Sequence, residues 1–132
     1  KGMGDDGIDI VTAFHYDANH QSAMNKKFVA AYNAEYKRNP DMFSVGGYDG
    51  MHVIYEALKK TGGKTDGDAL IAAAKGLKWD SPRGPAAIDP ETRDIVQTIY
   101  IRKVEKVAGE PQNVAFDKVE NVKDPARARN YK

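Results

Sequence analysis

Hydrophobic positions along the chain predict one strand, then three helices, then a strand-rich end. Between residues 7 and 14, β-branched and polar residues alternate, which is typical of a strand with Ile8 and Ile10 on one face. Apolar residues then recur every three or four positions in segments 22–37, 48–61 and 69–75, which predicts three amphipathic helices. Their apolar stripes are Met24, Phe28, Tyr32 and Tyr36; Tyr48, Met51, Ile54, Tyr55 and Leu58; and Leu70, Ala73 and Leu77.

Proline, glycine and capping residues predict where these helices begin and end. Asn39-Pro40 ends the first helix, because a residue before proline is pushed out of the helical region. Gly46-Gly47 is expected to let the backbone turn before the second helix, and Gly62-Gly63 to end it. Asp66 and its neighbours in segment 65–68 are expected to cap the third helix.

After Trp79 the pattern changes from helical to extended. Segment 81–85 contains two prolines and is not expected to continue a helix or a central strand. A short strand at 86–88, one helical turn at 89–94 and a hairpin of 98–107 with 113–116 follow. The tail 123–132 is expected at the surface. This order of elements is α/β in class.

Composition excludes several classes of protein. The chain has 132 residues, a net charge of +1 and 41% hydrophobic residues, which argues against disorder and against a nucleic-acid-binding surface. No apolar run has the length of a membrane helix. The absence of cysteine excludes disulfides and thiolate sites. The chain begins at Lys1 without a signal peptide, so either a signal was removed or the chain is a piece of a longer protein.

No cofactor or metal site is predicted. Residues 2–7 match the letters G-x-G-x-x-G, but these glycines precede a strand, and their aspartates would repel phosphate. His15, His20 and Asp17 have a spacing that suits no common zinc pattern, and surface or hinge roles are favoured for them. Asp66 and Asp68 lack the further oxygen ligands of a calcium loop.

Two groups of side chains are candidates for chemistry. Asp49 and His52 would share a helix face and could form an acid–base pair. No nucleophile motif accompanies them, so a solvated helix face is favoured and we do not predict an enzyme. Phe14-His15-Tyr16 follows a strand, where open α/β sheets bind ligands, and Tyr16 belongs to no apolar stripe, which favours a functional role. Tyr48 opens a helix and is open to two interpretations, ligand contact or first core residue.

Ordered motifs across residues 7–116 resemble a known family. They are Asn25-Lys26-Lys27-Phe28-Val29, Gly47-Tyr48-Asp49-Gly50-Met51, Glu56-Ala57-Leu58, Gly62-Gly63, Thr65-Asp66, Ser81-Pro82-Arg83-Gly84-Pro85, the segment 88–94, Tyr100-Ile101-Arg102 and Val104. In order and spacing they resemble the C-terminal part of ABC-transporter substrate-binding proteins of the branched-chain-amino-acid type, which have the type I periplasmic-binding fold.

The resemblance implies that this chain is a fragment of a two-lobed α/β protein. Residues 1–16 would be the last strand of the second lobe and a hinge crossing, and 17–78 the first-lobe helices. Residues 79–122 would be a crossing segment with the terminal hairpin, and 123–132 a surface tail. Strands that lack their usual partners would become open edges, so we expect the fragment to self-associate.

The resemblance also implies a function. Such proteins close two lobes around a small ligand, here an amino acid, an amide or an aromatic carboxylate, and present it to ABC permease subunits from a periplasmic or extracellular location. The main ligand anchors would lie upstream of this chain. The residues expected at the ligand are His15, Tyr16, Asp17, Tyr48, Asp49 and Arg83. Arg83 would serve an anionic ligand, with a surface loop cation as the alternative. A cytoplasmic ligand-sensing regulator with the same fold is the rival function.

Overall fold

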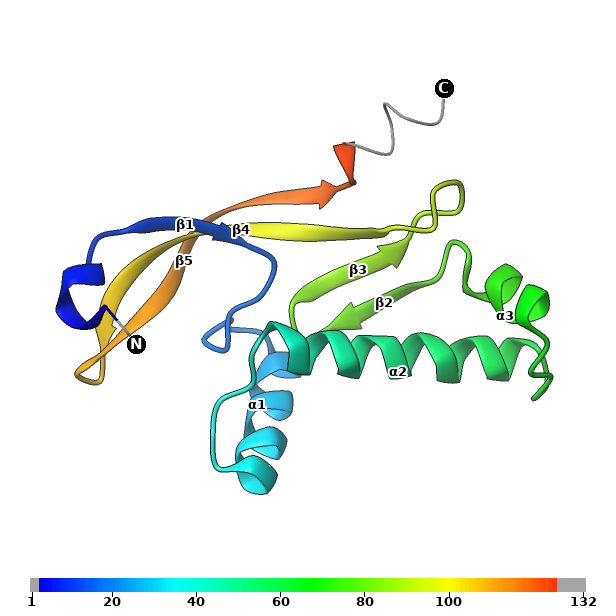
Figure 1. Ribbon diagram of the computed structural model, residues 1–132, viewed down its shortest axis with the longest axis horizontal. Helices are drawn as coiled ribbons and strands as arrows, with labels where there is room; N and C mark the ends of the chain where they lie inside the picture. The colour runs from blue at the N-terminus through cyan, green and yellow to red at the C-terminus, as the bar shows by residue number, and fades with distance from the viewer. Residues whose placement is uncertain (1–2, 126–132) are drawn as a thin grey trace.

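The computed structural model describes residues 3–125 and confirms the α/β class. Its elements, in chain order, are η1 (Gly4–Gly7), β1 (Val11–Phe14), α1 (Ala23–Tyr36), α2 (Met42–Lys60), α3 (Gly67–Ala74), β2 (Lys78–Ser81), β3 (Gly84–Ile88), β4 (Ile95–Val107) and β5 (Glu110–Val122). Figure 1 shows two parts joined by the long strand β4: a ribbon of β1, β4 and β5, and a hairpin–helix part of β2, β3 and the three α-helices. The last seven residues of the expected surface tail lie outside the described range.

Strand β4 connects the two parts because its two ends pair with different neighbours. Its first residues pair with β3 (Val96 with Ala87), and residues 100–103 pair with β1, both antiparallel. Residues 97–99 lie between these two ladders, and Gln97 and Ile99 pair with β5. The β4–β5 register shifts within this segment, between 97 and 99, and again between 101 and 102. The sheet is therefore least regular where it passes from one part to the other.

Local capping explains where the helices begin. Ser22 caps α1 by accepting a hydrogen bond from the Asn25 N–H at 3.0 Å, and Asp66 caps α3 as expected. The prediction that α2 begins at residue 48 is wrong. Asp41 and Ser44 form a capping box that starts α2 at Met42, so Gly46 and Gly47 lie inside the helix.

Helix ends follow the expected signals more closely. The chain leaves α1 at Lys37, whose left-handed φ of 55° ends the helix before Asn39-Pro40. Gly62 and Gly63 both have positive φ at the end of α2, and the Gly63 N–H donates to the Leu58 carbonyl at 2.9 Å.

The extended half contains more strand than the sequence predicts. Segment 81–85 is not a loop but the tip of the β2–β3 hairpin, in which Pro82 and Arg83 form the turn. Proline is tolerated there because a turn residue donates no ladder hydrogen bond. The expected helical turn at 89–94 is a turn between β3 and β4, where the Asp89 carboxylate accepts from the backbone of Glu91 and Thr92. Strand β4 begins three residues earlier than expected, and β5 extends past 113–116 at both ends.

The core within the described residues is small. Tyr16, Phe28 and Val45 form it, with Tyr32 packed against them. The expectation that the α2 stripe of Tyr48, Met51, Ile54 and Tyr55 faces the core is wrong for residues 3–125, where all four are exposed. The face of α2 that turns to the hairpin and α1 instead buries Val45, Asp49 and Ala57. Across the described residues, no helix has the length and apolarity of a membrane span.

Candidate ligand-binding site at the end of β1

Tyr16 anchors the loop that follows β1 from the inside. Its side chain is only 4% exposed, and its ring makes an edge contact with Phe28. Its hydroxyl donates to Asn25 Oδ1 at 3.1 Å. Burial, followed by the negative charges of Asp17 and Asp41, raises the pKa of the Tyr16 hydroxyl well above its usual range. Tyr16 therefore positions the loop as a neutral, buried donor.

Asn25 holds the same loop, although it is not among the residues expected at the ligand. It lies in the first turn of α1 and is 1% exposed. Its amide donates to the carbonyls of Ala18 at 3.0 Å and His20 at 2.9 Å. From the sequence, an asparagine at the polar start of a helix is expected to cap that helix. The fold shows that the Asn25 side chain instead binds the preceding loop.

Arg102 ties the loop to β4 from the other side. Its Nη1 donates to the Tyr16 carbonyl at 2.9 Å and lies 3.5 Å from Asp17 Oδ2, and its Nε donates to Thr12 Oγ1 at 3.2 Å. Burial raises the pKa of Asp17, opposed by the Asn19 N–H and by Arg102. The loop is thus fixed by an asparagine from α1 and an arginine from β4.

A second polar cluster surrounds Asp49, which projects from α2 toward the β2–β3 hairpin. Asp49 Oδ1 accepts from Trp79 Nε1 at 3.0 Å, and Oδ2 accepts from Ser81 Oγ at 2.9 Å. Arg83 Nε donates to the same Oδ2 at 2.8 Å. Arg83 Nη1 also donates to Gln97 Oε1 at 2.8 Å.

These bonds give Asp49 and Arg83 a structural role. Arg83 is buried, so the alternative of a surface loop cation does not describe it. The Asp49 carboxylate is shared among Trp79, Ser81 and Arg83 rather than paired with His52. Asp49 is also buried, so the favoured interpretation of a solvated helix face is wrong for it. The His52 ring instead lies 5.9 Å from the Trp79 ring.

His15 lies between the two clusters. Its ring is half-buried and tilted against the Phe14 ring, with the two ring centroids 4.5 Å apart. Burial lowers its pKa, and the positive charges of Arg83 and Arg102 lower it further, against a smaller opposite effect of Asp49. The surroundings of His15 at the end of β1 therefore disfavour the protonated form of its imidazole.

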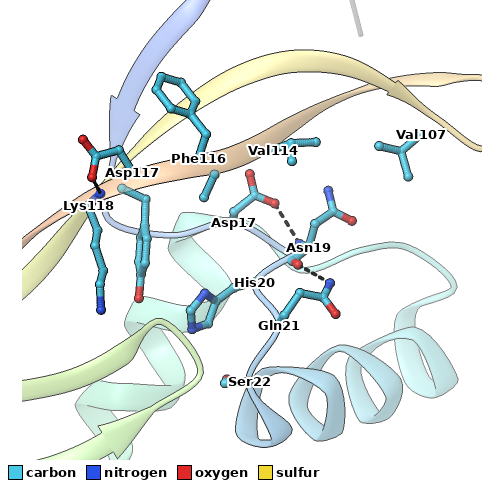
Figure 2. A pocket seen from close by; sticks show the side chains of 12 residues that line it. Asp17, Asn19, His20, Gln21, Ser22, Val107, Val114, Phe116, Asp117 and Lys118 are labelled. Carbon is cyan, nitrogen blue, oxygen red and sulfur yellow. Dashed lines mark hydrogen bonds between the residues drawn. The ribbon is translucent and has the colours of Figure 1, made fainter.

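A groove of about 710 Å³ runs between the loop after β1 and strand β5. Figure 2 shows His20 and Gln21 along the loop, with Val114 and Phe116 of β5 above them. Burial lowers the pKa of His20, whose ring lies 4.9 Å from that of Tyr100. Tyr48 lies apart from this groove, on α2, and is 44% exposed. Its ring centroid lies 5.0 Å from that of Phe28. Among residues 3–125, no three histidine or acidic side chains cluster as a metal site would require.

Comparison with known proteins identifies the family. A model of the periplasmic binding protein family matches residues 1–110. The chain belongs to this periplasmic binding protein family. A curated relative, the Leu/Ile/Val-binding protein homolog 6 of Brucella abortus, is 45% identical over 106 residues, which are 79% of this chain and 27% of the relative. The branched-chain type expected from the motifs is thereby confirmed.

Solved structures of other periplasmic binding proteins share the fold. A solute-binding protein of an ABC transporter from Rhodopseudomonas palustris BisB5, in complex with 3,4-dihydroxybenzoic acid, is 64% identical with a TM-score of 0.92, over 94% of this chain and 34% of that one. Another, from R. palustris HaA2 in complex with p-hydroxybenzoic acid, is 41% identical with a TM-score of 0.87, over the same shares of the two chains. This periplasmic binding protein chain therefore spans about a third of the length of its relatives.

Proposed function

We propose that the complete protein containing this chain is the solute-binding component of an ABC importer and that its ligand is an aromatic carboxylate. The observation that carries the proposal is the 64% identity to a solute-binding protein in complex with 3,4-dihydroxybenzoic acid. A second relative, at 41% identity, is in complex with p-hydroxybenzoic acid. Membership of a periplasmic binding protein family supports a periplasmic location.

The geometry at the end of β1 supports an anionic ligand. Among the six expected site residues, His15 is partly accessible and lies near the guanidinium groups of Arg83 and Arg102. We assign it the ligand contact. Four other expected site residues are buried and hydrogen-bonded within the protein: Tyr16, Asp17, Asp49 and Arg83. We assign to them the role of holding His15 and its loop in position. Tyr48 is assigned to the exposed face of α2.

A ligand panel tests the proposal on the complete protein. Thermal unfolding is followed with 3,4-dihydroxybenzoate, 4-hydroxybenzoate, benzoate and leucine, and binding is measured by calorimetry. Ligand at about a hundred times its Kd adds about 2.7 kcal/mol to the free energy of unfolding by mass action, so the correct acid should raise the melting temperature by several degrees. No shift with any of the aromatic acids would contradict the proposal.

Branched-chain amino acids are the second candidate class, favoured by the 45% identity to a Leu/Ile/Val-binding protein homologue. A shift with leucine and none with the aromatic acids would select it. The importer role is tested separately by uptake of the bound acid into cells with and without the gene. Unchanged uptake would favour the ligand-sensing alternative.

The contact assigned to His15 is tested by His15→Leu, with His52→Leu as the matched control on α2. Because leucine has no hydrogen-bond donor for a carboxylate, we expect His15→Leu to weaken binding about tenfold, with His52→Leu unchanged. Alanine at Tyr16 is unsuitable for the same test, because removing a buried ring would open a cavity.

A further inference from the structure

Tyr100 is anchored in both parts of the molecule. Its backbone belongs to the ribbon, where it pairs with Phe14 of β1 and Lys118 of β5. Its side chain points to the hairpin–helix part, where the hydroxyl donates to the Arg83 carbonyl at 2.8 Å. This residue is 6% exposed, so water competes little for the bond.

The β2–β3 turn is shaped to receive this hydroxyl. Gly84 has a φ of +99°, and a Cβ built on it would lie 2.5 Å from the Tyr100 hydroxyl oxygen. A side chain at position 84 would therefore displace Tyr100. The same turn is held from its other side by the ion pair of Arg83 with Asp49, so its carbonyl is a fixed acceptor. The His20 ring lies against Tyr100 as well, which brings the loop after β1 to the same point.

Tyr100 also stands next to the segment where β4 is least constrained. Residues 97–99 have no ladder partner in β1 or β3, and the β4–β5 register shifts between 97 and 99 and again between 101 and 102, so Tyr100 lies between the two shifts. Bending between the two parts is therefore easiest there. The Tyr100 hydroxyl bond joins the two parts one residue beyond this segment, so a bend that moves Tyr100 away from the β2–β3 turn must break it.

We propose that Tyr100 is a positioning residue for ligand binding: its hydroxyl fixes the angle between the ribbon and the hairpin–helix part and thereby presets the positions of Arg102 and Arg83 relative to His15. This inference rests on the proposed function. Presetting reduces the conformational freedom that binding must remove, which strengthens ligand affinity without any contact to the ligand.

The first test is Tyr100→Phe in the complete protein, with Tyr36→Phe, at an exposed tyrosine of α1, as the control. Spin labels at Lys27→Cys on α1 and Glu105→Cys on β4 report the distance between the parts by pulsed EPR without ligand. We expect Tyr100→Phe to broaden this distance distribution and to raise the Kd of the bound acid about fivefold, and Tyr36→Phe to change neither. A lower melting temperature with unchanged distribution and Kd would overturn the proposal, because it would show a purely local role.

The second test is a double-mutant cycle with Gly84→Ala. At Gly84 an alanine Cβ would clash with the Tyr100 hydroxyl and would also be strained by the positive φ. Gly109→Ala is the control for strain alone, because Gly109 has a φ of +84° and no atom within 4 Å of the added Cβ. We expect Gly84→Ala to broaden the EPR distribution and Gly109→Ala to leave it unchanged. Adding Tyr100→Phe to Gly84→Ala should broaden it no further, because both changes break the same bond. Additive broadening would overturn the proposal.

The two readouts separate this inference from the proposed function. The EPR distribution is measured without ligand, so it tests the positioning role whichever molecule binds. If no acid in the panel binds, the proposed function fails; if the distribution does not respond to Tyr100→Phe, the positioning role fails.

Discussion

Asp49 and Arg83 place opposite charges inside the protein, with 3% and 8% of their surfaces exposed. Charges removed from water are tolerated only when partners replace the lost hydration. Here the carboxylate receives three donors, from Trp79, Ser81 and Arg83, and the guanidinium reaches Gln97 as well. The pair joins α2 to the β2–β3 hairpin and fixes the turn that accepts the Tyr100 hydroxyl.

Removing one partner of this pair should therefore be costly. We expect Asp49→Ala to lower the free energy of unfolding by about 3–5 kcal/mol, because it leaves the Arg83 guanidinium buried without a counter-charge. Denaturant titration of the complete protein measures the change. Glu56→Ala is the control, since its ion pair with Lys59 is exposed and should contribute little. Equal effects of the two variants would contradict a buried role for Asp49.

Asp89 should make stability depend on pH in the acid range. The Lys123 ammonium at 2.7 Å and the N–H groups of Thr92 and Glu91 lower the pKa of Asp89 from 3.8 to about 2. A carboxyl whose pKa is lowered by folding stabilises the protein fully above its unfolded pKa, and this stabilisation is lost as pH falls to the folded value. The advantage of the wild type over Asp89→Asn should therefore be full above pH 4 and disappear toward pH 2. Melting temperatures across this range measure it, and a constant difference at all pH values would refute it.

At the scale of elements, local chemistry accounts for the helices, and pairing between distant segments accounts for the rest. Asp66 acts as the cap that its position predicts, and Ser22 caps α1 in the same way. The start of α2 differs from the prediction because Gly46-Gly47 resembles a turn, whereas the capping box of Asp41 and Ser44 decides where the helix begins. Strand β2 was missed because its pairing partner follows a turn rich in proline.

In the candidate site too, local sequence predicts some residues, and others depend on contacts between distant segments. Position after a strand was enough to single out His15 and Tyr16, but not to tell an accessible side chain from a buried one. Arg102 was not singled out as a site residue because its acceptor, the Tyr16 carbonyl, lies 86 residues away in the chain. Only the antiparallel pairing of β1 with β4 brings the two together.

The capping box of α2 can be tested at this scale. Asp41 accepts from the Ser44 N–H at 2.9 Å, so Asp41→Ala removes a partner from the first turn of the helix. We expect a loss of about 1 kcal/mol in the free energy of unfolding, with Asp41→Asn close to wild type because asparagine caps as well. Chemical denaturation measures both. An Asp41→Asn variant as unstable as Asp41→Ala would show that charge, rather than capping, matters at this position.

At the scale of the whole molecule, the described residues leave a large apolar surface on α2. Phe43 is 75% exposed, and Met51, Ile54 and Tyr55 continue the surface along the helix. A Cβ added at Gly46, Gly47 or Gly50 would meet no atom within 4 Å. Contiguous exposed apolar surface marks a binding face, and glycines on a helix allow another backbone to come close. Because the relatives are about three times longer, we expect this face to pack against polypeptide outside residues 3–125.

Thiol labelling of the complete protein tests this packing. Ile54→Cys places a thiol on the apolar face of α2, and Lys59→Cys places one on the exposed side of the same helix. If the face is covered, Ile54→Cys should react at least a hundredfold more slowly than Lys59→Cys in native conditions, because labelling then requires an opening of the structure. In denaturant, where the cover is lost, the two thiols should react at similar rates. The chain itself has no cysteine, so the only other thiols to remove are those in the rest of the protein. Equal native rates would show that the face is open to solvent, and the glycines of α2 would then have no packing role.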